Sequence, residues 1–179
     1  MKKYPLKCPM IIQPFSWHSD LKDMLLGLIE KETATPTLTE WEKVSRSDYT
    51  VESLRKKTSS YYNLLMPYLL EDIKPILKEI DVDIKDFAVV NYWFQQYHKT
   101  DYYDWHRHSH CSWIMLYYLE LPKGTPQTQA IDMWDNKTII KADVKEGDIL
   151  FMPGMIKHCS PVNDDDQRKT VIAFNTVVF

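Results

Sequence analysis

In Asp104-Trp105-His106-Arg107-His108-Ser109-His110, three imidazoles and a carboxylate alternate along a segment whose aromatic and β-branched surroundings indicate an extended backbone. Alternate side chains of a strand lie on one face of a sheet, so His106 and His108 point the same way and can bind one ion. A third imidazole, His158, follows a hydrophobic run and a Pro-Gly pair, where a small barrel presents side chains to its interior. The spacing predicts a metal site inside a β-barrel.

The residue types also bear on which metal binds. Three imidazoles with open coordination positions suit Fe(II) or a related divalent ion, whereas structural zinc prefers thiolates in a closed tetrahedron. The three cysteines show no C-x-x-C spacing. Asp104 offers a carboxylate ligand on the same face. The simpler interpretation is that Asp104 is a solvent-exposed turn residue. His110 continues the face and is interpreted as a solvent-facing residue or an outer hydrogen-bond partner.

The composition describes one ordinary globular domain, residues 1–179, because 44% of the residues are hydrophobic and 26% are charged. A net charge of -3 without Lys/Arg runs leaves nucleic acid unsupported as a partner. Residues 1–8 lack the apolar core of a signal peptide, and the longest apolar run, 113–119, is too short for a bilayer. We therefore expect a cytoplasmic protein without a membrane partner, in which Cys8, Cys111 and Cys159 are reduced.

The N-terminal half, residues 1–85, reads as helical support with a variable loop. Apolar residues recur with helical spacing over 19–31 and again over 59–80, where Pro67 and Pro75 must kink or divide the helix. A short strand is expected over 10–17. The polar stretch 33–58 is expected to be a surface excursion with one short strand or turn near 41–44.

The C-terminal half, residues 86–179, changes to strand-like runs separated by turn residues. The runs are 87–97, 111–121, 130–134, 138–144, 148–152, 156–162 and 169–179. So many strands in so short a stretch predict a sandwich or barrel. The expected fold class is α+β, with a jelly-roll core and N-terminal helices packed on one face of its major sheet.

A cation near the start of the last run is a candidate binding residue. Arg168 and Thr170 share one strand face, and a guanidinium beside a hydroxyl inside a barrel suits a carboxylate. The alternative is a solvated Arg168 paired with Asp164, Asp165 or Asp166 in the preceding turn.

These motifs together resemble the Fe(II)/2-oxoglutarate-dependent oxygenases, in particular the prolyl-hydroxylase-like group and the small oxygenases of phage and marine bacteria. The resemblance covers roughly residues 89–179. Its motifs are residues 91–97, His106-Arg107-His108, 116–122, 146–153 with His158, Arg168-Lys169-Thr170 and Ala173-Phe174-Asn175. The fold that it implies is a double-stranded β-helix, a jelly roll of the cupin-like kind.

The resemblance also implies an activity and a ligand set. His106, His108 and His158 would be the catalytic metal ligands for Fe(II), and Arg168 would bind the distal carboxylate of the co-substrate 2-oxoglutarate. Tyr97, Tyr118 and Thr170 would assist, although core packing explains both tyrosines equally well. The enzyme would be a dioxygenase that uses O2, hydroxylates an unidentified substrate and forms succinate and CO2. It departs from most of the family at His108, where an Asp or Glu is usual.

Two other functions fit the residues. A three-histidine cupin-type metalloenzyme would not use 2-oxoglutarate, and its Arg168 would bind an acidic substrate directly or pair with the Asp run. A non-catalytic jelly-roll binding module would grip a ligand such as sugar with Trp105, Trp113 and Trp134. The aromatic-rich final run, 172–179, suggests an edge strand that could pair with a second copy in a homodimer.

Overall fold

A computed structural model describes residues 9–52 and 58–179. Cys8 and the end of the expected 33–58 excursion lie outside these residues. The helices are α1 (His18–Ile29), α2 (Tyr49–Glu52), α3 (Ser60–Asp72) and α4 (Lys74–Glu79), with a 3-10 turn at Ile84–Asp86. The strands are β1 (Ile11–Pro14), β2 (Thr35–Leu38), β3 (Glu42–Ser47), β4 (Phe87–Tyr97), β5 (Tyr102–His106), β6 (Trp113–Glu120), β7 (Gln129–Ile131), β8 (Ile139–Lys141), β9 (Asp148–Pro153), β10 (His158–Ser160) and β11 (Lys169–Val178).

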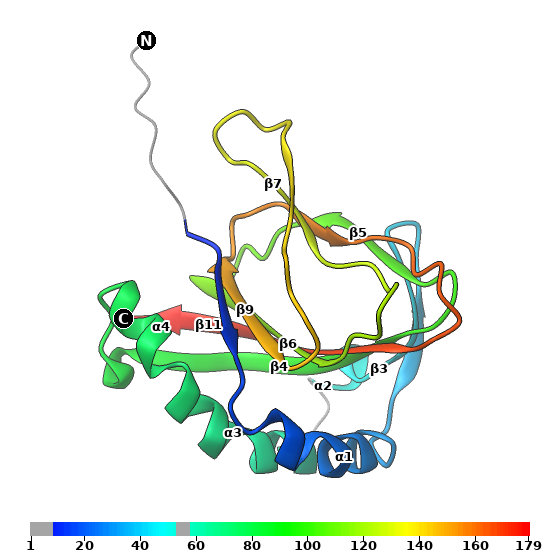
Figure 1. Ribbon diagram of the computed structural model, residues 1–179, viewed down its shortest axis with the longest axis horizontal. Helices are drawn as coiled ribbons and strands as arrows, with labels where there is room; N and C mark the ends of the chain where they lie inside the picture. The colour runs from blue at the N-terminus through cyan, green and yellow to red at the C-terminus, as the bar shows by residue number, and fades with distance from the viewer. Residues whose placement is uncertain (1–8, 53–57) are drawn as a thin grey trace.

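The strands form one antiparallel sheet that curls over itself. Its order is β1-β9-β6-β11-β4-β3-β5-β10-β7-β8, and β2 pairs with β3. In Figure 1, β5 and β7 lie above the layer made by β9, β6, β4 and β11. This is the expected jelly roll, a double-stranded β-helix, and the space between the two layers is where side chains of both can meet.

The helices cover one face of the major layer. Figure 1 shows α1 and α3 along the side of the sheet that faces away from β5 and β7. In α1, the residues with helical spacing, Leu21, Leu25 and Ile29, are all buried, and each contributes about 2 kcal/mol by burial. Pro67 lies inside α3, and the chain divides at Ile73, so that Pro75 occupies the first turn of α4. A proline there has no intrahelical N–H bond to lose.

The last strand is central, not an edge. β11 pairs with β4 on one side and with β6 on the other over nearly its whole length. Ile172 and Phe174 face the helices, whereas Val171 and Ala173 face the barrel interior. Because both edges of β11 are paired, the expectation of an exposed pairing edge over 172–179 is wrong. This strand therefore lends no support to a homodimer.

The 33–58 region is part of the sheet and not a mere surface excursion. β3 lies between β4 and β5 and bridges the two layers of the barrel. Asp101, fully buried, accepts hydrogen bonds at 2.8 Å from the backbone N–H groups of Ser45 and His98. These bonds fix the β4–β5 turn against β3, and so they position the strand that leads to His106. The polar composition of β3 concealed this role.

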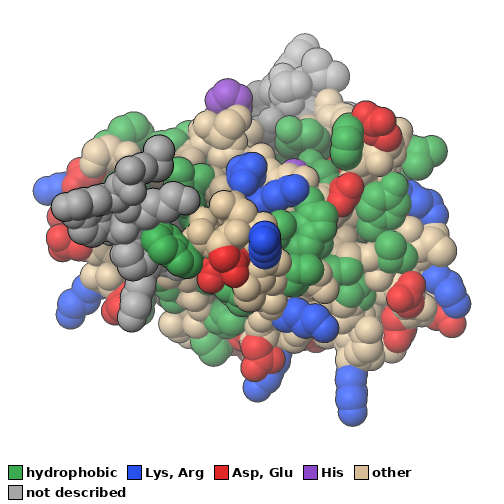
Figure 2. All heavy atoms as spheres, turned by 90° about the horizontal axis from the view of Figure 1, so that it is seen from above, with side chains coloured by type: hydrophobic (Ala, Val, Ile, Leu, Met, Phe, Trp, Pro, Cys, Tyr) green, Lys and Arg blue, Asp and Glu red, His purple; other side chains and the backbone are tan. Residues whose placement is uncertain are grey.

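The surface on the β7 side carries hydrophobic side chains intermixed with Lys and Arg (Figure 2). Four large exposed apolar residues lie on or between β7 and β8: Met133, Trp134, Ile139 and Ile140. Trp113, by contrast, is partly buried and stacks on Phe151 at 4.9 Å between ring centroids. Among the described residues, no helix is long and apolar enough to cross a membrane.

Candidate metal centre

His106, His108 and His158 meet between the two layers of the barrel. One ring nitrogen of each lies within 4.8 Å of the corresponding nitrogen of the others. His106 ends β5 and is the antiparallel partner of His158, which begins β10. His108 follows β5, and its backbone N–H donates to Gly154 O at 2.9 Å. The predicted convergence of these three side chains is thus present in the structure.

Each imidazole is oriented by a bond at its other nitrogen. His106 Nδ1 lies 2.7 Å from Asp104 O, His158 Nδ1 lies 3.0 Å from Ile156 O, and His108 Nδ1 lies 2.5 Å from Asn175 Oδ1. Carbonyl oxygens only accept, so each Nδ1 carries the hydrogen. All three Nε2 atoms then keep a lone pair for a metal, the arrangement usual for metal-binding histidines. The donor set therefore fits a divalent ion of the Fe(II) type.

Burial keeps the three imidazoles neutral, the form that binds a metal. Burial is the main cause that lowers the pKa of His106 to about 4; the hydrogen bond to the Asp104 carbonyl opposes this shift, and the neighbouring His108 adds to it. Burial also lowers the pKa of His108 and, more strongly, that of His158, whose side chain is 3% exposed. At neutral pH the three imidazoles are therefore already deprotonated at the nitrogens that would bind a cation.

The same shifts predict that acid destabilises the metal-free protein. At pH values between about 4, the pKa of His106 in the folded protein, and 6.5, its pKa in the unfolded chain, His106 is protonated in the unfolded chain but neutral in the folded protein. The free energy of unfolding should therefore fall as the pH is lowered through this window, by about 3 kcal/mol at most from His106. Urea unfolding from pH 7 to pH 4 measures it. His106→Gln should flatten that dependence, and an unchanged slope in the variant would contradict the assignment.

Asn175 is expected to tune metal affinity without being a ligand. Its side-chain oxygen holds His108 from β11, and loss of such an orienting bond typically weakens metal binding about 10- to 100-fold. We expect this loss in Asn175→Leu, measured by calorimetric titration with Ni(II) or Co(II). Asn175→Asp retains an acceptor and is the matched control, so it should bind the metal at least as well as the unaltered protein. Equal affinity in the leucine variant would show that Asn175 has no orienting role.

An inner cavity extends from the histidines toward the start of β11. At its far end, Lys169 is 1% exposed, and its ammonium donates to Ser160 Oγ at 2.7 Å and to Pro126 O at 3.0 Å. The ammonium also lies 4.9 Å from the centre of the Tyr97 ring. Burial lowers the pKa of Lys169 to about 7. Within the described chain, no carboxylate forms an ion pair with Lys169, so an anion entering the cavity would find a cation ready for it.

The structure does not bring Arg168 and Thr170 to the histidines. Both contact Glu120, Arg168 with two bonds of 2.8 and 3.0 Å, and Arg168 also binds Glu30 at 2.5 Å. They do share a strand face, as expected, but it is the face opposite to Lys169. The pairing of β11 with β4 and β6 fixes this register, and a shift of one residue exchanges the two faces of a strand.

The other predicted residues divide between the inner cavity and its surroundings. Tyr97 lines the inner cavity, and its hydroxyl donates to Gln95 Oε1 at 2.9 Å. Tyr118 is fully buried in the barrel core and donates to Thr128, itself a cavity residue, at 2.7 Å. Asp104 lies outside the histidine cluster, because its carboxylate accepts from the Trp105 N–H at 2.7 Å. His110 is exposed and also outside the cluster.

Three contributors were not predicted from the sequence. Lys169 was hidden by its neighbour Arg168, the more obvious partner for a carboxylate. Asn175 entered the sequence analysis only as part of a motif, although it interrupts the apolar run of the last strand on the same face as Val171 and Ala173. Tyr103 stacks on the His106 ring at 3.9 Å between centroids. Tyr103 lies three residues before His106, so simple alternation does not place the two rings on one face; the irregularity in the pairing of β5 with β10 between these residues is not visible in the sequence.

Comparison with known proteins supports the fold. No family model matches the sequence, and no curated protein matches it. An oxidoreductase of the 2OG-Fe(II) oxygenase family from Burkholderia pseudomallei superposes with a TM-score of 0.71 at 7% identity, over 93% of this chain and 84% of that one. A viral collagen prolyl hydroxylase from Paramecium Bursaria Chlorella virus-1, solved with 2-oxoglutarate, gives 0.62 at 13% identity, over 93% and 94%.

A third similar structure contains both a metal and the co-substrate. HygX from Streptomyces hygroscopicus, solved with nickel and 2-oxoglutarate bound, superposes with a TM-score of 0.65 at 11% identity, over 94% of this chain and 82% of that one. The resemblance drawn from the sequence motifs is thus confirmed as a structural relationship to 2OG-Fe(II) oxygenases. At such low identity, it establishes the fold and not the reaction or the substrate.

Proposed function

We propose that this protein is an Fe(II)- and 2-oxoglutarate-dependent oxygenase that hydroxylates an as yet unidentified substrate, with succinate and CO2 as co-products. The observation that carries the proposal is one cavity with three convergent imidazoles and, at its far end, a buried lysine that has no carboxylate partner among residues 9–52 and 58–179. A molecule that chelates the metal at one end and carries a carboxylate at the other would bind both the imidazole-held metal and the lysine. 2-Oxoglutarate is such a molecule. The structural relatives described above support the same ligands.

In the proposed site, His106, His108 and His158 hold the iron through Nε2. Lys169 binds the distal carboxylate of 2-oxoglutarate, and Ser160 and Tyr97 hold the ammonium in place. Lys169 takes the role that the sequence suggested for Arg168, whose guanidinium is already paired with Glu120 and Glu30. The bound metal would supply the oxygen activation that such enzymes require.

The apolar wall of the inner cavity has its own function. Leu116, Val171 and Ala173 line the cavity between the lysine and the histidines. Exclusion of water there strengthens the attraction between Lys169 and a carboxylate, and it protects reactive species from the solvent. Because all three metal ligands are neutral, the centre is more positive by one charge than a centre with the usual carboxylate. Its potential and its affinity for anions should differ accordingly.

Anaerobic titration of the Fe(II)-loaded protein with 2-oxoglutarate tests the proposal. We expect one equivalent of co-substrate to produce a visible metal-to-ligand charge-transfer band, followed by succinate formation when air is admitted. Stoichiometric iron binding without the band would favour a three-histidine metalloenzyme that does not use 2-oxoglutarate. Absence of iron binding would favour a non-catalytic jelly-roll module.

A further inference from the structure

A second hollow, here called the vestibule, opens onto the histidines from outside. It shares Trp93, Gln95, Tyr103, His106 and His108 with the inner cavity, so the two are continuous at the metal cluster. Its own lining adds five residues: Tyr49, Arg107, Ser109, His110 and Asn175. If 2-oxoglutarate fills the inner cavity, the vestibule is the remaining approach to the metal that these two hollows offer.

The wall where the two hollows join carries an unsatisfied donor. Trp93 is 4% exposed, and its indole Nε1 has no hydrogen-bond partner among the described residues. Its ring stacks near His108, at 6.0 Å between centroids, and Tyr49 packs edge-on against it at 5.0 Å. A buried N–H without a partner costs about 1–3 kcal/mol. A ligand with an acceptor at this point would remove that cost.

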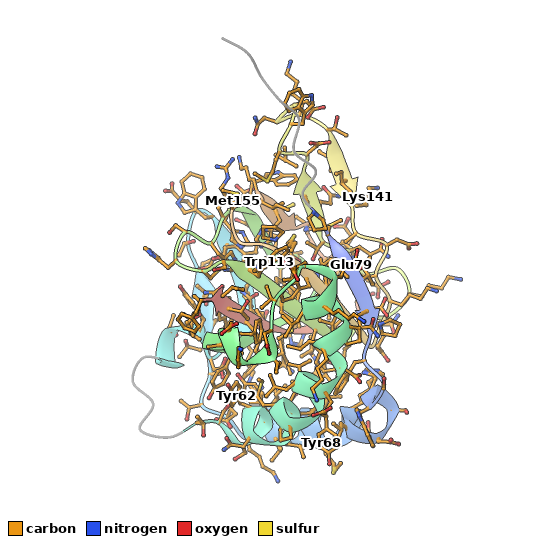
Figure 3. The ribbon with its side chains drawn as sticks, turned by 90° about the vertical axis from the view of Figure 1, so that its left-hand side faces the viewer. Tyr62, Tyr68, Glu79, Trp113, Lys141 and Met155 are labelled. Carbon is orange, nitrogen blue, oxygen red and sulfur yellow. The ribbon has the colours of Figure 1, made fainter. Side chains whose placement is uncertain are left out.

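The charged side chains that line the two hollows all have one sign, although the carboxylates of Glu42 and Asp104 lie near enough to act on Tyr103 and His106 from behind the walls. The chain contains 25 Asp and Glu residues, yet none of them lines the described walls of the inner cavity or the vestibule. Arg107 is exposed at the vestibule, where its Nε donates to Met155 O at 3.1 Å. Met155 lies on the side of the barrel remote from Tyr62 and Tyr68 of the helical layer (Figure 3). The Nε bond fixes the guanidinium while its terminal nitrogens have no partner among the described residues.

From these observations, and resting on the proposed function, we propose that the primary substrate is anionic. It carries a carboxylate or phosphate group that binds Arg107, an apolar body that packs between Tyr49 and Tyr103, and an acceptor that reaches the Trp93 N–H. A dianionic co-substrate offsets the charge of Lys169 and only part of the charge of a metal held by three neutral ligands. The remaining positive potential, together with Arg107, selects an anion over a neutral molecule.

Nuclear magnetic resonance of 15N-labelled protein tests this with Zn(II) as a diamagnetic substitute for iron. The six tryptophans give separate indole N–H signals, and Trp93→Phe identifies the one that belongs to Trp93. Phenylacetate, phenyl phosphate and the neutral phenylacetamide are titrated into protein saturated with 2-oxoglutarate. We expect the anions to move the Trp93 signal downfield and at least one of them to bind about tenfold more tightly than the amide. The preferred anion identifies the substrate as a carboxylate or a phosphate.

Two charge-removal variants show whether Arg107 is responsible. Arg107→Gln should abolish the preference for anions, whereas Lys141→Gln, which removes an exposed charge outside the vestibule, should preserve it. Equal binding of all three probes, anion binding that survives Arg107→Gln, or no shift at millimolar concentrations would overturn the inference. A shift of the Trp93 signal with 2-oxoglutarate alone would show that the Trp93 N–H binds the co-substrate. It would overturn the proposal that this N–H binds an acceptor of the primary substrate.

Failure of the proposed function can be recognised separately. If 2-oxoglutarate does not bind to the metal-loaded protein, the oxygenase proposal fails. The probe titration can still be carried out on metal-free protein, since Arg107, Tyr49 and Trp93 are not metal ligands. If 2-oxoglutarate binds normally and the anions show no preference, only the inference about the substrate is overturned.

Discussion

Lys169→Met is expected to weaken 2-oxoglutarate binding by about 100-fold, because it leaves the distal carboxylate in an apolar cavity without its cation. Loss of one partner of a buried, hydrogen-bonded charge pair costs on the order of 3 kcal/mol. Metal affinity should stay unchanged, since Lys169 lies at the opposite end of the cavity from the histidines. Titration of the charge-transfer band under anaerobic conditions measures the co-substrate affinity, and calorimetry with Ni(II) measures the metal affinity.

The matched control is the neighbouring cation. Arg168→Met removes a positive charge from the opposite face, where Glu120 and Glu30 bind it, so it should affect stability more than co-substrate affinity. If Arg168→Met weakened 2-oxoglutarate binding and Lys169→Met did not, the face assignment would be reversed. Lys169→Arg should restore part of the affinity because it keeps the positive charge. The restoration should be incomplete because the cavity is shaped for an ammonium and not for a guanidinium.

Lys169 should also give co-substrate binding a pH dependence. Burial lowers its pKa to about 7 in the free protein, and a bound carboxylate would raise that pKa again. Above pH 7, therefore, binding requires the uptake of a proton. The affinity for 2-oxoglutarate should decrease as the pH rises from 7 toward the pKa of the complex. This decrease should be absent in Lys169→Met.

The comparison of sequence with structure turns on strand faces. His106 and His108 were assigned to one face by simple alternation, and His158 joined them because a Pro-Gly turn precedes it. Arg168 and Thr170 were correctly placed on a common face, but alternation alone does not say which face looks inward. That choice depends on the pairing of β11 with β4 and β6, including the irregularity after Thr170 that aligns it with Glu120. Pairing between distant strands is not a local property of the sequence.

The fold was predictable for a related reason. Helical spacing over 19–31 and 59–80, followed by many short strand-like runs, already indicated an α+β jelly roll with a helical layer. A short strand or turn was expected near 41–44, but the full extent of β3, Glu42–Ser47, and its place between β4 and β5 were not predicted, because its residues are mostly polar. A polar strand that bridges two layers lacks the alternation of apolar and polar residues from which strands are predicted.

His158→Ala is expected to lower the affinity for Fe(II), Co(II) or Ni(II) by more than about 100-fold, because a single outer hydrogen-bond partner already accounts for 10- to 100-fold. His158 lies on β10, whereas His106 and His108 belong to β5 and the turn after it. Its removal therefore leaves two ligands from one segment and no ligand from the other side. Calorimetric titration of the metal-free protein measures the change.

Two controls make this result specific to the cluster. His110→Ala removes an exposed imidazole outside the cluster, so metal affinity should not change. Asp104→Ala removes the carboxylate that the sequence offered as a substitute ligand but retains the backbone carbonyl that orients His106. Circular dichroism establishes that each variant is folded. If Asp104→Ala abolished metal binding and a folded His158→Ala did not, the metal would be held by the β5 segment and its turn alone, and the site within the barrel would have to be abandoned.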